Sequence, residues 1–115
     1  MKLAIVGCRD YNNKKFIFDS IKKEYNINEI TCIISGGCSG VDNIAEEFAR
    51  ENNIKTIIYK PNWKLYGRAA GPIRNKLIIE DCDQVLAFWD NKSKGTKSSI
   101  DIANSLEKKI IIKYI

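Results

Sequence analysis

Short apolar runs alternate along this chain with stretches in which apolar residues recur at helical spacing. The runs are rich in Ile, Val and aromatic residues, which is typical of strands that are buried on both faces of a sheet. They cover residues 2–6, 29–35, 55–59, 84–89 and 109–114. The pattern therefore predicts five strands.

The stretches between the runs predict four helices. The first apolar stripe consists of Ile17, Phe18, Ile21 and Tyr25, and the second of Val41, Ile44, Ala45, Phe48 and Ala49. Both spacings place the apolar side chains on one face of a helix. A third helix should begin near Pro72, because proline suits the first helical turn, where its missing N–H has no intrahelical partner. A fourth should span about residues 96–106.

The order β-α-β-α-β-α-β-α-β defines an α/β fold. Strict alternation implies a doubly wound five-stranded parallel sheet, with right-handed crossovers and helices on both faces. At 115 residues the chain is long enough for a single domain over residues 1–115 and too short for two cores. Ligands of such sheets bind beyond the carboxyl ends of the strands, so the residues after each strand are the candidates for a site.

Composition narrows the chemistry. With 44% hydrophobic and 29% charged residues the chain is typical of a soluble globular domain. No apolar run approaches the ~20 residues that a membrane span needs, so we expect no membrane association and a cytoplasmic location. The net charge of +5 favours an anionic partner, either a phosphate-bearing small molecule or nucleic acid.

Histidine is absent from the chain, which excludes His-dependent triads, His-ligated zinc and imidazole acid–base chemistry. The four cysteines form no C-x-x-C pair, so we expect reduced thiols. We expect neither a cofactor nor a metal.

The first candidate residues follow the first strand. Gly7 lets the backbone turn sharply, and the planar guanidinium of Arg9 would lie at the carboxyl edge of the sheet, where it can bind phosphate or carboxylate. The alternative for Arg9 is an ordinary surface arginine after a tight turn. Cys8 is expected to pack rather than to react.

Three glycines follow the second strand and lead directly into the second helix. Gly36, Gly37 and Gly40, with Ser39 among them, should leave backbone N–H groups uncovered at a helix N-terminus, where anions bind. The stretch fits neither the dinucleotide fingerprint nor the P-loop pattern. Asp42 either caps the helix or accepts a hydrogen bond from a ribose hydroxyl.

The connection over residues 60–75 is long and carries aromatic and cationic side chains. Trp63 either plugs the core or stacks on a base of a bound ligand. Arg74 and Asn75 lie in the first turn of a helix, where a cation opposes the helix dipole unless an anion is bound nearby.

The segment after the fourth strand also ends at the start of a helix. Asp90, Ser93, Gly95 and Thr96 either form a second phosphate-binding turn or an ordinary N-capped turn. Trp89, the last residue of that strand, is a second candidate for stacking on a base.

Together these motifs resemble a known family. The segments 7–10, 36–42, 70–75, 88–90 and 93–96, with Trp63 and Gly67, are similar to the YspA-like, YpsA-related branch of the SLOG superfamily, over residues 1 to about 113. That superfamily also contains the "lonely guy" phosphoribohydrolases and the DNA-processing protein of natural transformation. The resemblance implies a Rossmann-like fold that binds nucleotides or nucleotide-derived molecules, with the 36–40 loop on phosphate.

The resemblance also implies candidate catalytic residues, with one departure from the family's pattern. Active relatives cleave an N-glycosidic bond with an arginine that Arg74 matches and a glutamate shortly after a Gly-Thr pair. Here Gly95-Thr96 is followed by Lys97-Ser98-Ser99, and Asp101 lies one helical turn too late. An oxocarbenium-like transition state needs a carboxylate, so the candidate catalytic residues are Asp42, Asp90 and Arg74.

Three functional hypotheses follow. The first is a module that senses or sequesters a nucleotide-derived phosphate ligand. The second is a nucleoside-5′-monophosphate phosphoribohydrolase, and the third is a protein that binds single-stranded nucleic acid. A phosphoribosyltransferase is disfavoured, because its loop usually carries two adjacent acids and only Asp90 is present. Since relatives often pair through helices that flank the sheet, we also expect a homo-oligomer.

Overall fold

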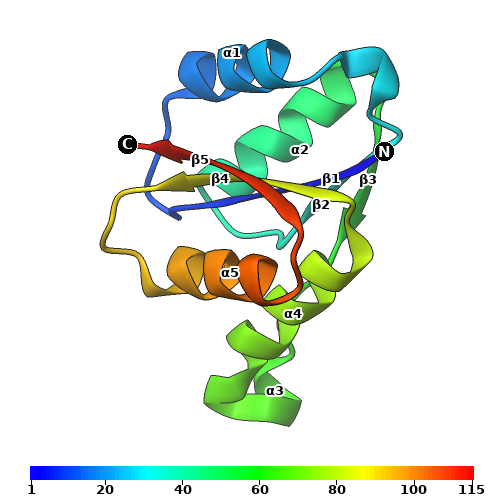
Figure 1. Ribbon diagram of the computed structural model, residues 1–115. Coiled ribbons are helices and arrows are strands. Elements are labelled where there is room, and N and C mark those ends of the chain that lie inside the picture. The colour runs from blue at the N-terminus through cyan, green and yellow to red at the C-terminus, as the bar shows by residue number, and fades with distance from the viewer.

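The computed structural model describes residues 1–115 and contains one five-stranded sheet (Figure 1). Its strands are β1 (Lys2–Gly7), β2 (Cys32–Ser35), β3 (Lys55–Ile58), β4 (Gln84–Trp89) and β5 (Lys109–Tyr114). Its α-helices are α1 (Lys14–Glu24), α2 (Val41–Glu51), α3 (Trp63–Tyr66), α4 (Ala70–Asp81) and α5 (Lys94–Ser105). Two short 3₁₀ helices, η1 (Ile27–Glu29) and η2 (Gly67–Ala69), complete the chain.

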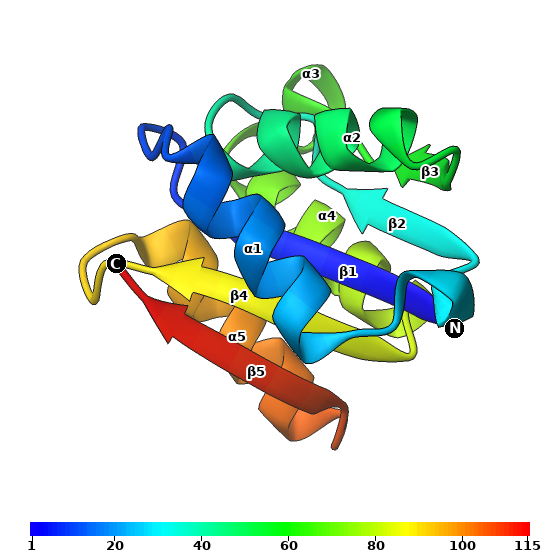
Figure 2. The ribbon, with the colours of Figure 1, turned by 90° about the horizontal axis from the view of Figure 1, so that it is seen from above.

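All strand pairs are parallel and follow the order β3-β2-β1-β4-β5 (Figure 2). The chain winds from β1 outward to β3 and then crosses back, so that β4 and β5 extend the sheet on the other side of β1. The predicted doubly wound, Rossmann-like α/β fold is therefore confirmed. The order reverses between β1 and β4, which is where such sheets bind ligands.

The helices cover both faces of the sheet, as predicted. Successive side chains of β1 point to opposite faces: Leu3 and Ile5 pack with α1 and α2, and Ala4 and Val6 pack with α4 and α5. Figure 1 shows these two layers above and below the sheet. None of the helices combines the length and the apolar character that crossing a bilayer would require.

Two expectations about the strands need correction. The second strand begins at Cys32 and not at residue 29, because the Asn26 side chain accepts a hydrogen bond from the Asn28 N–H (3.0 Å) and the chain turns through η1 instead. The strands β3 and β5 are edge strands with several exposed or half-buried residues, so only β1, β2 and β4 are buried on both faces.

The helix boundaries also differ. Part of the long connection folds into α3, because the Asn62 side chain caps it by accepting a hydrogen bond from the Leu65 N–H (3.1 Å). The helix α4 begins at Ala70, so that Pro72 lies within its first turn rather than at its start. The helix α5 begins at Lys94, with Ser93 as its N-cap, and ends at Ser105.

Candidate functional site

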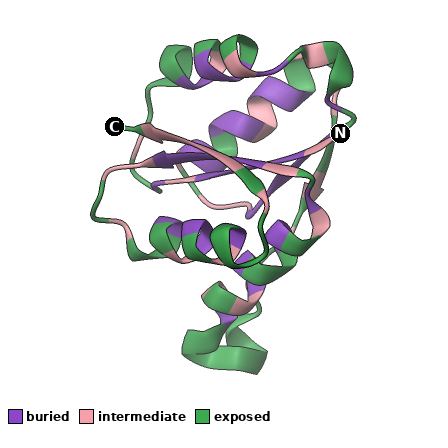
Figure 3. Ribbon diagram, in the orientation of Figure 1, coloured by how far each residue is buried: buried purple, intermediate pink, exposed green.

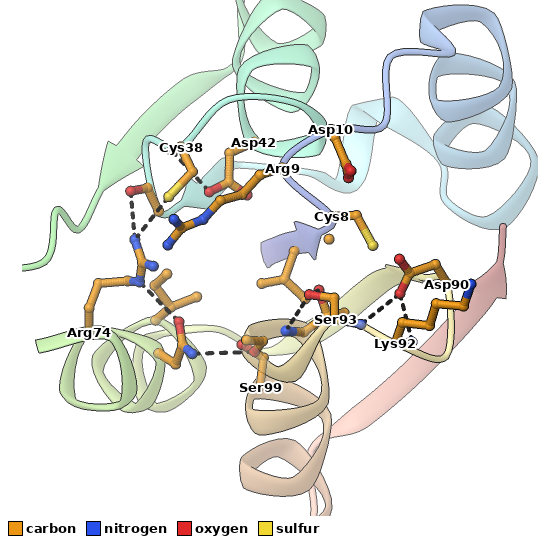
Figure 4. Close-up of a pocket in the computed structure, with 17 residues that line it drawn as sticks. Cys8, Arg9, Asp10, Cys38, Asp42, Arg74, Asp90, Lys92, Ser93 and Ser99 are labelled. Atoms are coloured by element: carbon orange, nitrogen blue, oxygen red, sulfur yellow. Dashed lines mark hydrogen bonds between the residues drawn. The ribbon is translucent and has the colours of Figure 1, made fainter. Parts of the chain in front are cut away.

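A cavity of about 500 Å³ opens at the carboxyl ends of β1 and β4, where the strand order reverses (Figure 4). A volume of this size lies in the range of small-molecule sites. Ten of the residues predicted from the sequence line it: Gly7, Arg9, Gly36, Asp42, Arg74, Asn75, Asp90, Ser93, Gly95 and Thr96. Four separate loops and helix starts therefore converge on one place.

Arg74 is the most unusual of these residues, because its charged side chain is only 7% exposed. Its Nε donates to Asn75 Oδ1 (2.9 Å) and its Nη1 donates to the Gly36 carbonyl oxygen (2.8 Å). These bonds fix the plane of the guanidinium. The Asn75 side chain is itself held by a longer bond to the Gly95 carbonyl oxygen (3.4 Å).

The guanidinium of Arg74 forms no ion pair within the chain. Its second terminal nitrogen, Nη2, has no acceptor among the hydrogen bonds of Arg74 and lies on the cavity side of the group (Figure 4). The Asp42 carboxyl lies near enough to interact with this charge but forms no ion pair with it, and a buried cation without a direct ion-pair partner is costly to the fold. Arg74 is therefore available to an anion in the cavity, which would also lower that cost.

The glycine loop before α2 is more closed than its sequence predicts. The Gly37 N–H donates to Ser35 Oγ (3.2 Å) and the Cys38 N–H donates to Asp42 Oδ2 (3.1 Å). Short polar side chains commonly compete for loop amides in this way. These two N–H groups are not free for a ligand, so the expected nest of open amides is wrong for this part of the loop.

The same loop is also fastened to the loop after β1. The Ser39 hydroxyl donates to the Arg9 carbonyl oxygen (2.9 Å), and the Val41 N–H donates to the Cys8 carbonyl oxygen (3.2 Å). A Cβ at Gly40, where φ is +73°, would lie 2.4 Å from both of those carbonyl oxygens. Ser39 and Gly40 hold the two loops together and do not line the cavity.

Two carboxyl groups of the cavity differ in their surroundings. Burial raises the pKa of Asp42 to about 6, although the Cys38 N–H and Arg74 act in the opposite direction. Asp90 Oδ1 accepts hydrogen bonds from the Ser93 N–H (2.7 Å) and the Lys92 N–H (2.8 Å), which lower the pKa of Asp90. Asp42 can thus hold a proton near neutral pH, and Asp90 stays ionised.

The start of α5 forms the most open wall of the cavity. The Thr96 N–H donates to Ser93 Oγ, a long bond of 3.4 Å, so Ser93 caps the helix. A Cβ added at Gly95 would meet nothing within 4 Å. The positive end of a 12-residue helix therefore faces the cavity with its glycine uncovered.

Seven further residues line the cavity that sequence analysis did not propose: Val6, Cys8, Asp10, Cys38, Ile78, Lys92 and Ser99. Helical spacing could have found two of them, since Ile78 and Ser99 lie one turn after Arg74 and Thr96 on the same helix faces. Ser99 is buried and carries a hydroxyl, so the part of the cavity wall formed by α5 offers no carboxylate. No three acidic or cysteine side chains are arranged so that they could hold a metal ion.

The predicted aromatic residues lie elsewhere, and the lining contains no aromatic ring at all. The Trp89 indole N–H donates to the Ser93 carbonyl oxygen (3.1 Å), so the Trp89 side chain stabilises the β4–α5 loop. Trp63 is 51% exposed on α3, which excludes a core plug. Gly37 also lies outside the lining, with its Cα side turned toward Ile58.

Comparison with known families gives one match. A sequence profile described as YAcAr, the YspA, cpYpsA-related SLOG family, matches residues 1–66, which is more than half of the 115 residues. A comparison with curated proteins finds no match.

Solved structures share the fold. DNA processing protein A from Helicobacter pylori, described for its single-stranded DNA binding mode, has a TM-score of 0.76 and 24% identity, and the match covers 97% of this chain and 64% of that one. DNA processing protein A (DprA) from Streptococcus pneumoniae has a TM-score of 0.79 and 22% identity, with coverage of 96% and 49%. A protein called TM1055 has a TM-score of 0.66 and 18% identity, with coverage of 95% and 71%. The chain thus spans less than two thirds of the length of the two DNA processing proteins.

Proposed function

The chain belongs to the YspA, cpYpsA-related SLOG family, and on that premise we propose that it binds a nucleotide or a nucleotide-derived phosphate ligand in the cavity. The observation that carries the proposal is Arg74, a buried guanidinium that forms no ion pair within the chain and lines the cavity. This agrees with the first functional hypothesis from the sequence, in which the protein senses or sequesters such a ligand.

The phosphate is assigned to the space between Arg74 and the start of α5. Free amides of a first helical turn and the helix dipole both favour an anion there. Arg9 and Lys92 are exposed cations on the rim of the cavity and add to the attraction. Asp42 is placed to accept a hydrogen bond from a sugar hydroxyl, and the apolar side chains of Val6 and Ile78 line the remaining wall.

Isothermal titration calorimetry of the purified chain with nucleoside mono- and diphosphates, cyclic nucleotides and ADP-ribose tests the proposal. We expect micromolar binding of at least one of them. Arg74→Gln should weaken it at least tenfold, and Arg50→Gln, which removes an exposed arginine at the end of α2, should leave it unchanged. Absence of binding, or equal binding by Arg74→Gln, refutes the proposal.

A second candidate function is hydrolysis of the N-glycosidic bond of a nucleoside monophosphate. It is favoured by Asp42, because a buried carboxyl with a pKa of about 6 can donate a proton to a leaving base. We expect base release, followed by chromatography, to fall as pH rises above about 6 and to be lost in Asp42→Asn. Release that survives Asp42→Asn combined with Asp90→Asn excludes this mechanism.

Self-association through the flanking helices and a cytoplasmic location stay predictions. Sedimentation velocity of the purified chain tests the first, and cell fractionation tests the second.

A further inference from the structure

The segment between β3 and α4 stands out from the rest of the molecule (Figure 1). Every residue from 62 to 69 is exposed, as the green lower part of Figure 3 shows. The exposed side chains include large ones: Leu65 is 66%, Trp63 51% and Tyr66 47% exposed. Clustered apolar surface of this kind marks an interaction site.

The charged residues within this segment and the first part of α4 are all basic. Residues 60–79 contain five cations and no acid. Arg74 is buried beside the cavity, and the other four, Lys60, Lys64, Arg68 and Lys76, are exposed. None of these four forms an ion pair within the chain. A surface whose exposed cations form no ion pair is complementary to an anionic partner.

The two aromatic side chains lie against the start of α4 and the depression beside it. The six-membered ring of Trp63 lies against the start of α4, where a Cβ on Gly71 would be 3.6 Å from its Cη2 atom. Tyr66 forms a wall of a depression of about 120 Å³ between α3 and α4, with Lys60 and Leu77 also in its lining. Rings that are already ordered lose little conformational freedom when they stack on a ligand.

We propose that this surface, the α3 platform formed by residues 60–68 with Lys76 and Leu77, binds single-stranded nucleic acid, with Trp63 and Tyr66 stacking on bases and the four exposed cations contacting phosphates. Aromatic rings between cations are the usual means by which proteins hold single strands. The proposal concerns a surface outside the cavity and does not depend on the ligand proposed there.

Two other occupants fit the surface less well. A second copy of the chain, paired about a two-fold axis, would bring the platform against itself and place the same unpaired cations opposite one another. A nucleic acid duplex stacks its bases internally and offers only its backbone, so it would leave the exposed rings of Trp63 and Tyr66 without partners.

Fluorescence anisotropy with labelled oligo-dT and oligo-U of about 15 nucleotides tests the proposal on the full chain. We expect binding at low salt that weakens as salt rises. Trp63→Ala combined with Tyr66→Ala should reduce the affinity at least tenfold, because each stacked base contributes about 1–3 kcal/mol. Both residues are exposed, so the thermal unfolding of this variant should stay close to that of the native sequence.

A matched pair of charge variants separates the platform from general attraction. Lys64→Gln with Arg68→Gln and Lys22→Gln with Lys109→Gln both lower the net charge from +5 by the same amount. Only the first pair should reduce the salt dependence, by about 1.4 in the slope of log K against log salt, since each single-strand phosphate contact contributes about 0.7.

Several results would overturn the proposal. The proposal is wrong if no oligonucleotide binds at low salt, or if the two charge variants lose the same affinity and salt dependence. It is also wrong if a duplex of the same length binds as tightly as the single strands. A dimer that Trp63→Ala with Tyr66→Ala dissociates, in a protein that binds no oligonucleotide, would assign the platform to a second copy instead. Preference for oligo-dT or oligo-U decides between DNA and RNA as the source of the strand.

Discussion

Two loops of this protein lead from a strand into a helix at the cavity, and they use glycine in opposite ways. Before α2, a Cβ on Gly36 would lie 2.5 Å from Arg74 Nη1 and 2.9 Å from Asp42 Oδ2, so the chain's own side chains fill the space. In the first turn of α5, a Cβ on Gly95 would have no atom of the protein within 4 Å. The chain's own side chains pack against the first loop, whereas a ligand in the cavity can reach the backbone of the second.

The caps of the two helices show the same contrast. The N-cap of α2 is Gly40, which has no side chain to offer, and Asp42 in the first turn binds the Cys38 N–H instead. The N-cap of α5 is Ser93, whose side chain accepts a hydrogen bond from the Thr96 N–H within the same turn. A cluster of glycines therefore indicates that something approaches the backbone closely, and only the surroundings decide whether that is the protein or a ligand.

The packed character of the first loop predicts the largest effect. Gly40→Ala would force a Cβ to within 2.4 Å of two backbone carbonyl oxygens at a φ of +73°. Overpacking and a left-handed backbone together should lower the free energy of unfolding by about 3 to 5 kcal/mol. The measurement is urea unfolding followed by circular dichroism.

Gly67→Ala is the control for this substitution, because Gly67 also has a positive φ, of +56°, but nothing within 4 Å of the new Cβ. It should cost only the backbone term, about 1 to 3 kcal/mol, because φ +56° with ψ −130° is a conformation that residues other than glycine rarely adopt. Equal losses in the two variants would mean that backbone conformation, and not packing between the loops, explains Gly40.

The buried carboxylate of the same loop predicts a pH dependence. The pKa of Asp42 is about 6 in the folded protein, above its ordinary value of 3.8. Between these values the folded protein retains a proton that the unfolded chain releases, so this group's contribution to stability is full below pH 3.8 and is lost as pH rises to about 6. Asp42→Asn removes that loss, because asparagine does not titrate.

Relative to the native sequence, Asp42→Asn should therefore gain about 2 kcal/mol of unfolding free energy between pH 4 and pH 7. Urea unfolding of both proteins at several pH values measures this difference. Asp101→Asn, which changes an exposed carboxylate on α5, is the control. If the difference in unfolding free energy between Asp42→Asn and the native sequence does not vary with pH, burial does not raise the pKa of Asp42.

The open character of the second loop predicts an effect on affinity with little effect on stability. Gly95→Val adds a Cβ that meets no atom of the protein within 4 Å, and valine is somewhat more favourable than glycine in a helix. The unfolding free energy should change by less than about 0.5 kcal/mol, and the affinity for the nucleotide found by calorimetry should fall at least tenfold.

Ser98→Val adds the same side chain on the same helix outside the cavity lining, and it should leave the affinity unchanged. If Gly95→Val binds as well as the native sequence, the phosphate does not lie at the start of α5. Binding would then have to be sought beside Arg9 at the other side of the cavity.

The contrast between the loops also explains how much the sequence could predict. The five strands and the position of Arg74 follow from local patterns, because buried runs and helical spacing depend on neighbours in the chain. The partners of the glycine loop do not, since the bonds of Ser39 to Arg9 and of Val41 to Cys8 join residues about 30 positions apart. Trp89 shows a different limit, because its indole N–H donates to the Ser93 carbonyl oxygen only four positions away and its ring does not line the cavity.

The short helix α3 could not be predicted for a different reason. Four residues are too few to show a helical period, and the helix is a single turn, closed by backbone hydrogen bonds to the Asn62 and Trp63 carbonyl oxygens and capped by the Asn62 side chain. The exposure of Trp63 follows from that helix.

The smallest predicted effect tests whether the cap of α5 serves the ligand as well as the helix. Ser93→Ala removes a cap whose hydrogen bond to the Thr96 N–H is long, so the loss of unfolding free energy should be about 0.5 to 1 kcal/mol. Asn13→Ala removes a cap of similar kind from α1, where the Asn13 side chain accepts a hydrogen bond from the Phe16 N–H (3.1 Å) and does not line the cavity. Both variants should lose similar stability, but only Ser93→Ala should weaken nucleotide binding, by about threefold, because its hydroxyl orders the turn that faces the phosphate. Equal affinities in the two variants would mean that the α5 turn keeps its shape without the cap, and that the open glycine alone makes this wall accessible.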